Sequence, residues 1–136
     1  LLAQAVAAVA ALLLAPAAVV LTGDLVDRGT AEEYEHLRAL LAPLPGPVWL
    51  MPGNHDDAAV MRQVFTEHDE LQPPDGDPAL AGHVLWVRRT AGLRVVALDT
   101  VVPRAAHGRL CGARLAWLGR TLDAEPGTPT VLAMHH

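Results

Sequence analysis

Apolar runs alternate with helical patterns along the chain, and this alternation predicts an α/β fold. The first 21 residues carry no charge, and Pro16 divides them into a predicted buried helix over residues 3–14 and a strand over Ala17–Leu21. A membrane span or a signal peptide is the alternative reading of this stretch. Both are disfavoured because Pro16 interrupts the run and no basic segment precedes it.

A second helix begins at a capping box made by Thr30 and Glu33. Its apolar residues, among them Tyr34 and Leu37, recur at helical spacing until the prolines at positions 43, 45 and 47 end it. The pattern then predicts a short buried strand over Val48–Met51 and a short helix that opens near Asp57.

The second half of the chain begins with a proline-rich loop over Leu71–Gly82. Two strands are predicted after it, His83–Arg89 and Leu93–Leu98, with Ala91 and Gly92 as the hairpin turn between them. Leucines at positions 115, 118 and 122 define a last helix, and the final strand is predicted over Thr130–Met134.

Polar side chains follow several of these strands at the point where each strand ends. Gly23 and Asp24 follow the first, the sequence GNHD (53–56) follows the second, Asp99 follows the Leu93 strand, and His135 and His136 follow the last. Each could be no more than a turn. Because the carboxyl ends of strands in α/β sheets line the ligand crevice, we expect these side chains to converge. Carboxylate, amide oxygen and imidazole together suit Mn, Fe or Zn.

Composition narrows the class of protein. A chain of 136 residues, of which 51% are hydrophobic, has the length of one domain or of part of a larger one. Its net charge of −5 and its scattered basic residues argue against nucleic acid as a partner. Cys111 is the single cysteine, so an internal disulfide is excluded and a cytoplasmic location is predicted.

The motifs GDLVDRG (23–29) and GNHD (53–56), followed by an apolar strand that ends in two histidines, resemble the calcineurin-like metallophosphoesterase superfamily. The stretches YEHLRALLAPLPGPVWLMPGNHDD (34–57) and LDTVVPRAAHGRLCGARLAWL (98–118) are similar to its bacterial cyclic nucleotide phosphodiesterase branch. The resemblance implies a four-layer α/β/β/α sandwich formed by residues 1–136 as a partial domain. It is incomplete at both ends, because the family's Asp-x-His and Gly-His-x-His ligand motifs are not found.

The resemblance also assigns roles to residues of this chain. Asp24 matches the aspartate that bridges two metals, while Asn54 and His135 match ligands of the second metal, with His136 as an alternative to His135. His55 matches the histidine that stabilises charge or protonates the leaving alkoxide. In the surroundings of these ligands, Asp27 would orient His55, and Arg28 would support its loop or meet phosphate.

The implied cofactors are two divalent metal ions, Mn, Fe or Zn, and the implied reaction is direct attack on a phosphodiester by a hydroxide held between them. A small-molecule substrate is predicted, most simply a 3′,5′-cyclic nucleotide, and a homodimer is left open. Two alternatives stand beside this interpretation: a phosphoprotein phosphatase, and a non-catalytic scaffold or remnant. Because ligand motifs are missing, we expect the 136-residue chain alone to bind metal weakly and to be inactive.

Overall fold

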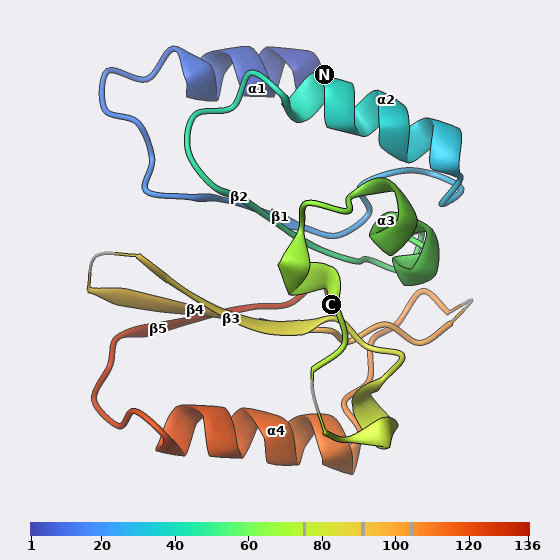
Figure 1. Ribbon diagram of the computed structural model, residues 1–136, viewed down its shortest axis with the longest axis vertical. Helices are drawn as coiled ribbons and strands as arrows, with labels where there is room; N and C mark the ends of the chain where they lie inside the picture. The colour runs from blue at the N-terminus through green and yellow to red at the C-terminus, as the bar shows by residue number, and fades with distance from the viewer. Residues whose placement is uncertain (75, 91, 104) are drawn as a thin grey trace.

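The computed structural model describes residues 1–74, 76–90, 92–103 and 105–136, which form four layers in the order helices, sheet, sheet, helix (Figure 1). The elements follow one another as α1 (Leu2–Ala10), β1 (Val19–Thr22), α2 (Ala31–Leu41), β2 (Val48–Met51), α3 (Ala58–Val64), the 3₁₀ turns η1 (Asp69–Leu71) and η2 (Pro78–Leu80), β3 (Leu85–Thr90), β4 (Leu93–Leu98), α4 (Gly112–Asp123) and β5 (Thr130–Ala133). This arrangement confirms the predicted four-layer α/β fold.

The chain builds two separate sheets. In the first, β1 and β2 are parallel and pair from Val19 opposite Val48 to Thr22 opposite Met51, with α1, α2 and α3 on the outer side (Figure 1). In the second, β4 lies between β3, which is antiparallel to it, and β5, which is parallel. Helix α4 covers the outer face of this second sheet (Figure 1).

The two sheets pack against each other through tryptophans. Trp49 of β2 and Trp86 of β3 meet edge to face, with ring centroids 5.8 Å apart. The indole Nε1 of Trp86 donates a hydrogen bond of 2.9 Å to the carbonyl oxygen of Leu50. Both tryptophans are buried, and these contacts fix the position of one sheet relative to the other.

The residues that the sequence predicts at the starts of α2 and α3 form the hydrogen bonds that cap these helices. Thr30 and Glu33 form both hydrogen bonds of the capping box at the start of α2. Asp57 caps α3 by accepting hydrogen bonds from the backbone N–H groups of Ala59 and Val60.

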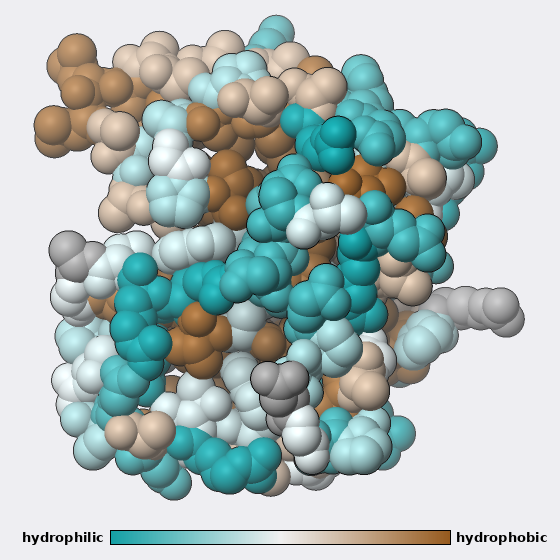
Figure 2. Space-filling view, in the orientation of Figure 1, coloured by the Kyte–Doolittle hydropathy of each residue, from teal (hydrophilic) through white to brown (hydrophobic). Residues whose placement is uncertain are grey.

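The first helix is shorter than predicted. It ends at Ala10 instead of residue 14, and only Val6 on it is buried. Pro16 disfavours helical backbone in the residue before it, and the chain must turn here to enter β1. The leucines at positions 12–14 are consequently exposed, and the brown group at the upper left of Figure 2 lies over this segment. These leucines are therefore apolar residues that the fold does not bury.

Two other details differ from the predicted outline. The proline-rich loop contains the 3₁₀ turn η2, capped by Asp77. The strand predicted from His83 begins at Leu85, because the side chain and backbone of His83 serve other contacts. Of the predicted hairpin turn, Ala91 lies outside the described residues, although Thr90 and Leu93 pair across it.

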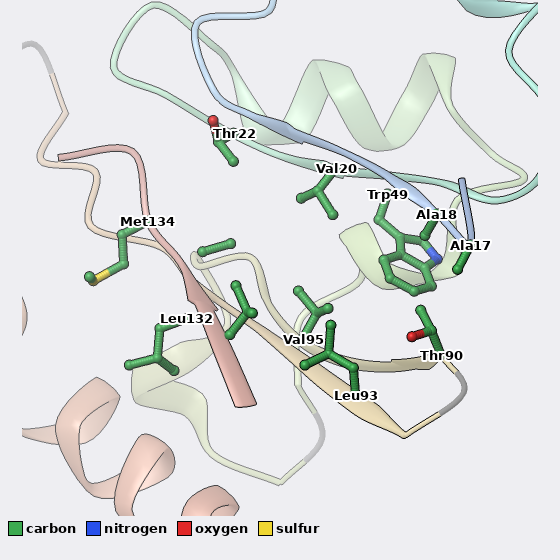
Figure 3. Close-up of a pocket in the computed structure, with 12 residues that line it drawn as sticks. Ala17, Ala18, Val20, Thr22, Trp49, Thr90, Leu93, Val95, Leu132 and Met134 are labelled. Atoms are coloured by element: carbon green, nitrogen blue, oxygen red, sulfur yellow. The ribbon is translucent and has the colours of Figure 1, made fainter. Parts of the chain in front are cut away.

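An apolar groove of about 430 Å³ opens between the two sheets beside β1 and β5 (Figure 3). Its walls include Val20, Trp49 and Val95. Val131, Leu132 and Met134, on β5 and the residue after it, also line this groove and are exposed. Both β1 and β5 are edge strands in the described sheets.

Among the described residues, no helix combines the length and apolar character required to cross a bilayer.

Candidate metal centre and adjoining cleft

Three strand ends bring the predicted metal ligands together. Asp24 follows β1, Asn54 follows β2, and His135 follows β5, so the two sheets contribute to one site. The backbone makes a sharp turn at Gly23 and Asp24, which both have positive φ angles, of 98° and 50°. Among the described residues, Asp24 alone adopts this left-handed backbone without being a glycine. The turn directs its carboxylate back across the strand ends.

The side chains of these three residues meet at short distances. Nε2 of His135 lies 3.2 Å from Oδ1 of Asp24 and 3.3 Å from Oδ1 of Asn54. Oδ1 of Asp24 also accepts a hydrogen bond of 3.1 Å from the backbone N–H of His55. The structure thus brings together the residues that the sequence predicts as one ligand set.

The hydrogen bonds of His135 show that this set suits a cation. Nδ1 of His135 lies 2.8 Å from the carbonyl oxygen of Thr22, which can only accept, so Nδ1 carries the proton. In the neutral ring Nε2 then presents a lone pair toward the side-chain oxygens of Asp24 and Asn54. With the ring in that form, three acceptors converge on one point, an arrangement that a bound divalent ion would stabilise. The donor types also fit such an ion.

Two glycines make room for this convergence. A Cβ placed on Gly53 would overlap the backbone nitrogen and Oδ1 of Asp24 and would lie 2.9 Å from Cε1 of His135. A Cβ on Gly23 would lie 2.5 Å from Nδ1 of His135 and 2.6 Å from the backbone nitrogen of Gly53. The close approach of the strand ends therefore depends on the absence of side chains at both positions.

Asp56 and Tyr34 hold the loops of the first sheet in place. The carboxylate of Asp56 accepts hydrogen bonds from the backbone N–H groups of Leu25 and Gly53 and from the hydroxyl of Tyr34. Burial raises the pKa of Asp56, and it also raises the pKa of the Tyr34 hydroxyl. The Tyr34 oxygen accepts in turn from the backbone N–H of Asp57, so one network ties α2 to both loops.

His55 stands beside the ligand set with half of its side chain exposed. Its Nδ1 donates to the backbone carbonyl of Asp27 at 2.9 Å, while the Asp27 carboxylate lies 3.7 Å away. The Asp27 carbonyl, followed by the negative charge of Asp24, raises the pKa of the His55 imidazole. Asp27 is thus placed to orient His55, and its backbone oxygen makes the hydrogen bond.

Arg28 forms an exposed ion pair with Glu33, with Nε and Oε1 3.3 Å apart, and its backbone N–H donates to the same carboxylate.

His136 turns away from the ligand set, because its Nδ1 lies 2.9 Å from the hydroxyl of Thr100. Its ring packs edge to face on that of His135. Of the two terminal histidines, His135 is therefore the one that faces Asp24 and Asn54.

Within the described residues no cluster of three or more His, Cys, Asp or Glu side chains could hold a metal ion. Asp24 and His135 are the two members of those types at the site, and the amide of Asn54 supplies the third donor. A fully coordinated ion would need further ligands from water, substrate or additional protein.

A cleft of about 630 Å³ adjoins the ligand set. Asn54, His55 and Arg28 line it from the first sheet, and His83 and Asp99 line it from the second. Sequence patterns identified Asp99 as a strand-end residue but missed His83 and the cleft-lining Arg62. His83 lies at the boundary of a proline-rich loop, and no spacing or motif distinguishes it from a surface histidine.

Comparison with known proteins places the chain in a family. The model of the family described as calcineurin-like phosphoesterase matches residues 2–136. The chain belongs to the calcineurin-like phosphoesterase family.

Several curated relatives are similar over most of the chain. A cAMP/cGMP dual specificity phosphodiesterase of Mycobacterium tuberculosis is 37% identical over 129 residues, which cover 90% of this chain and 37% of the relative. A probable glycerophosphodiester phosphodiesterase of Arcobacter nitrofigilis is 31% identical over 121 residues, covering 89% and 42%. A 3′,5′-cyclic-nucleotide phosphodiesterase of a Nostoc species is 32% identical over 120 residues, covering 85% and 39%. The chain spans about two fifths of the length of these relatives.

Proposed function

We propose that this chain forms part of the active site of a metal-dependent phosphodiesterase that hydrolyses 3′,5′-cyclic nucleotides. The convergence of Asp24, Asn54 and His135 beside the cleft is the observation that carries the proposal. Similarity to relatives named as cyclic nucleotide phosphodiesterases supports the substrate class. Glycerophosphodiesters are the second candidate substrates, because relatives named for that activity are similar over the same span.

In this proposal Asp24 would be a ligand shared by two divalent ions, and Asn54 and His135 would be the other ligands that this chain gives to one of them. When bound, two such ions supply water activated at neutral pH and charge stabilisation at phosphorus. Mn, Fe and Zn all match a donor set of carboxylate, amide oxygen and imidazole. The free Cys111 agrees with a cytoplasmic location for the protein.

His55 is proposed to donate a proton to the leaving alkoxide. Its Nδ1 is occupied by the carbonyl of Asp27, so Nε2 is the atom left to face the cleft. The hydrogen bond to the Asp27 carbonyl and then the nearby carboxylate of Asp24 raise the pKa of His55 and favour the protonated imidazolium, which is the form that acts as an acid. Arg28 lines the same cleft, and its guanidinium, which is paired with Glu33, would support the loop or meet the phosphate.

The test uses the full-length protein that contains this chain, assayed with cyclic AMP, a glycerophosphodiester and a phosphopeptide. Cyclic AMP hydrolysis that a chelator abolishes and Mn²⁺ restores supports the proposal. Replacing His55 with Ala should lower kcat by roughly 10²-fold or more, the scale of a positioned acid, whereas the exposed His36→Ala serves as the matched control. Preference for the phosphopeptide would favour a phosphatase. Absence of all hydrolysis, with metal bound, would favour the non-catalytic scaffold.

A further inference from the structure

A second histidine faces the cleft from the other sheet. His83 lines the cleft together with Asn54 and His55, and its side chain is 24% exposed. Its Nδ1 lies 3.3 Å from Oδ2 of Asp99, the residue that follows β4. This pair is separate from the ligand set of Asp24, Asn54 and His135.

Hydrogen bonds hold the carboxylate of Asp99 in place, where it acts as a hydrogen-bond acceptor. Its side chain is 3% exposed. Oδ2 accepts a hydrogen bond from the backbone N–H of Val84 at 3.1 Å, and Oδ1 accepts from that of Val101 at 2.7 Å. The backbone carbonyl of Asp99 is held by the guanidinium of Arg114 at 2.8 Å. Because donors approach both carboxylate oxygens, Nδ1 of His83 is the donor in the remaining contact.

This contact decides which atom of His83 meets a ligand. With the proton on Nδ1, the neutral ring has its lone pair on Nε2, and no hydrogen-bond partner for Nε2 occurs among the described residues. The backbone adds rigidity, since the N–H of His83 donates to the carbonyl of Leu80 and its own carbonyl accepts from Arg62. In its neutral form His83 therefore offers the cleft a positioned acceptor at Nε2.

An uncharged acceptor suits a particular group on the substrate. A phosphodiester carries negative charge, so a carboxylate close to it would be repelled, whereas a neutral imidazole nitrogen is not. A hydroxyl is the donor that such a nitrogen can bind. We propose that Nε2 of His83 accepts a hydrogen bond from a hydroxyl of the substrate next to its phosphodiester, so that His83 selects substrates with that hydroxyl. This inference rests on the proposed phosphodiesterase function, and the ribose 2′-hydroxyl and a glycerol hydroxyl are the two sources of the group.

The experiment compares cyclic AMP with 2′-deoxy cyclic AMP in the full-length protein. In the native protein we expect kcat/KM to be about tenfold higher for cyclic AMP, the scale of one hydrogen bond. His83→Phe keeps an aromatic ring but removes the acceptor, and it should bring the ratio to about one. His83→Gln places a carbonyl oxygen near the position of Nε2 and should restore part of the preference. The glycerol hydroxyl, the second source of the group, is tested by assaying a glycerophosphodiester beside an analogue that lacks the hydroxyl next to the phosphodiester.

A second measurement does not depend on turnover. Nitrogen-15 NMR of the imidazole in the 136-residue chain should show His83 protonated on Nδ1 and unprotonated on Nε2, and Asp99→Asn should weaken this tautomer preference. A ring protonated on Nε2 would overturn the inference, as would a substrate ratio that His83→Phe leaves unchanged. Loss of all phosphodiester hydrolysis in the native protein would instead overturn the proposed function, and this inference with it.

Discussion

Nε2 of His135 lies 3.2 Å from Oδ1 of Asp24, a contact between residues of different sheets. The candidate metal centre consequently exists only when the sheets are packed together. Metal binding to such a site adds to the stability of the folded chain by mass action.

The first prediction concerns metal affinity. Zn²⁺ or Mn²⁺ should raise the Tm of the 136-residue chain only at concentrations well above micromolar, because three donors provide incomplete coordination. Asp24→Asn and His135→Ala should each weaken binding by tenfold or more in a calorimetric titration. His36→Ala, at an exposed position on α2, should leave it unchanged. Equal loss in all three variants would contradict the assigned ligand set.

The second prediction concerns Gly53. An alanine there would overlap Asp24 and press on His135, so Gly53→Ala should destabilise the fold by about 1–3 kcal/mol, as overpacking does. It should also separate the metal ligands and lower metal affinity.

The matched control is Gly119→Ala on α4, where a Cβ meets nothing within 4 Å. This substitution should stabilise the chain by up to about 1 kcal/mol through helix propensity. Chemical denaturation of the two variants measures both effects, and similar values for them would contradict the close-approach argument.

The third prediction concerns acid stability. Glu70 is buried, which opposes its ionisation, but hydrogen bonds from His68 and from the backbone N–H of Leu50 outweigh burial and lower its pKa. The side chain of His68 is mostly buried, with 17% of it exposed.

A carboxylate with a lowered pKa in the folded state stabilises the protein above its ordinary pKa of about 4.3. That contribution should decline as the pH falls below this value and through the lower pKa of the folded state. Glu70→Gln keeps an acceptor for Leu50 but loses the charge. Its destabilisation, about 1–3 kcal/mol at pH 7, should shrink at pH 3. Thermal unfolding at both pH values checks this, and a pH-independent difference would rule it out.

The fourth prediction concerns the link between the sheets. Trp86→Phe keeps an aromatic side chain but leaves the buried carbonyl of Leu50 without its donor, at a cost of about 1–3 kcal/mol. Because this carbonyl belongs to β2, which leads into Asn54, the substitution should also weaken metal binding. Trp117→Phe, on the partly buried face of α4, should change stability less and metal affinity not at all. Unfolding and calorimetry report the two effects separately.

Much of this architecture could be predicted from the sequence. Capping residues such as Thr30 and Asp57 act within a few positions of the chain, so their pattern locates helix starts well. Strand-end residues could be expected to converge because sheet topology places strand ends at one edge.

Other features depend on contacts between distant segments. The length of α1 could not be read from its apolar run, because exposed and buried leucines have the same hydropathy. The role of His83, which precedes β3, depends on Asp99, which follows the paired strand β4 and which no local sequence pattern connects to His83. The resemblance already favoured His135 over His136, whereas the contacts with Thr22 and Thr100 that set the directions of the two rings appear only in the fold.

The apolar groove beside β1 and β5 also has a consequence for the behaviour that we expect of the chain in solution. In the described sheets β1 and β5 are edge strands, and the exposed side chains of Val131, Leu132 and Met134 line the groove beside them, a combination that favours association between chains. We expect association to rise steeply with concentration, so that dilute and concentrated samples contain different species. Light scattering across a dilution series would find the crossover, and affinities and melting temperatures of the variants can be compared only below it.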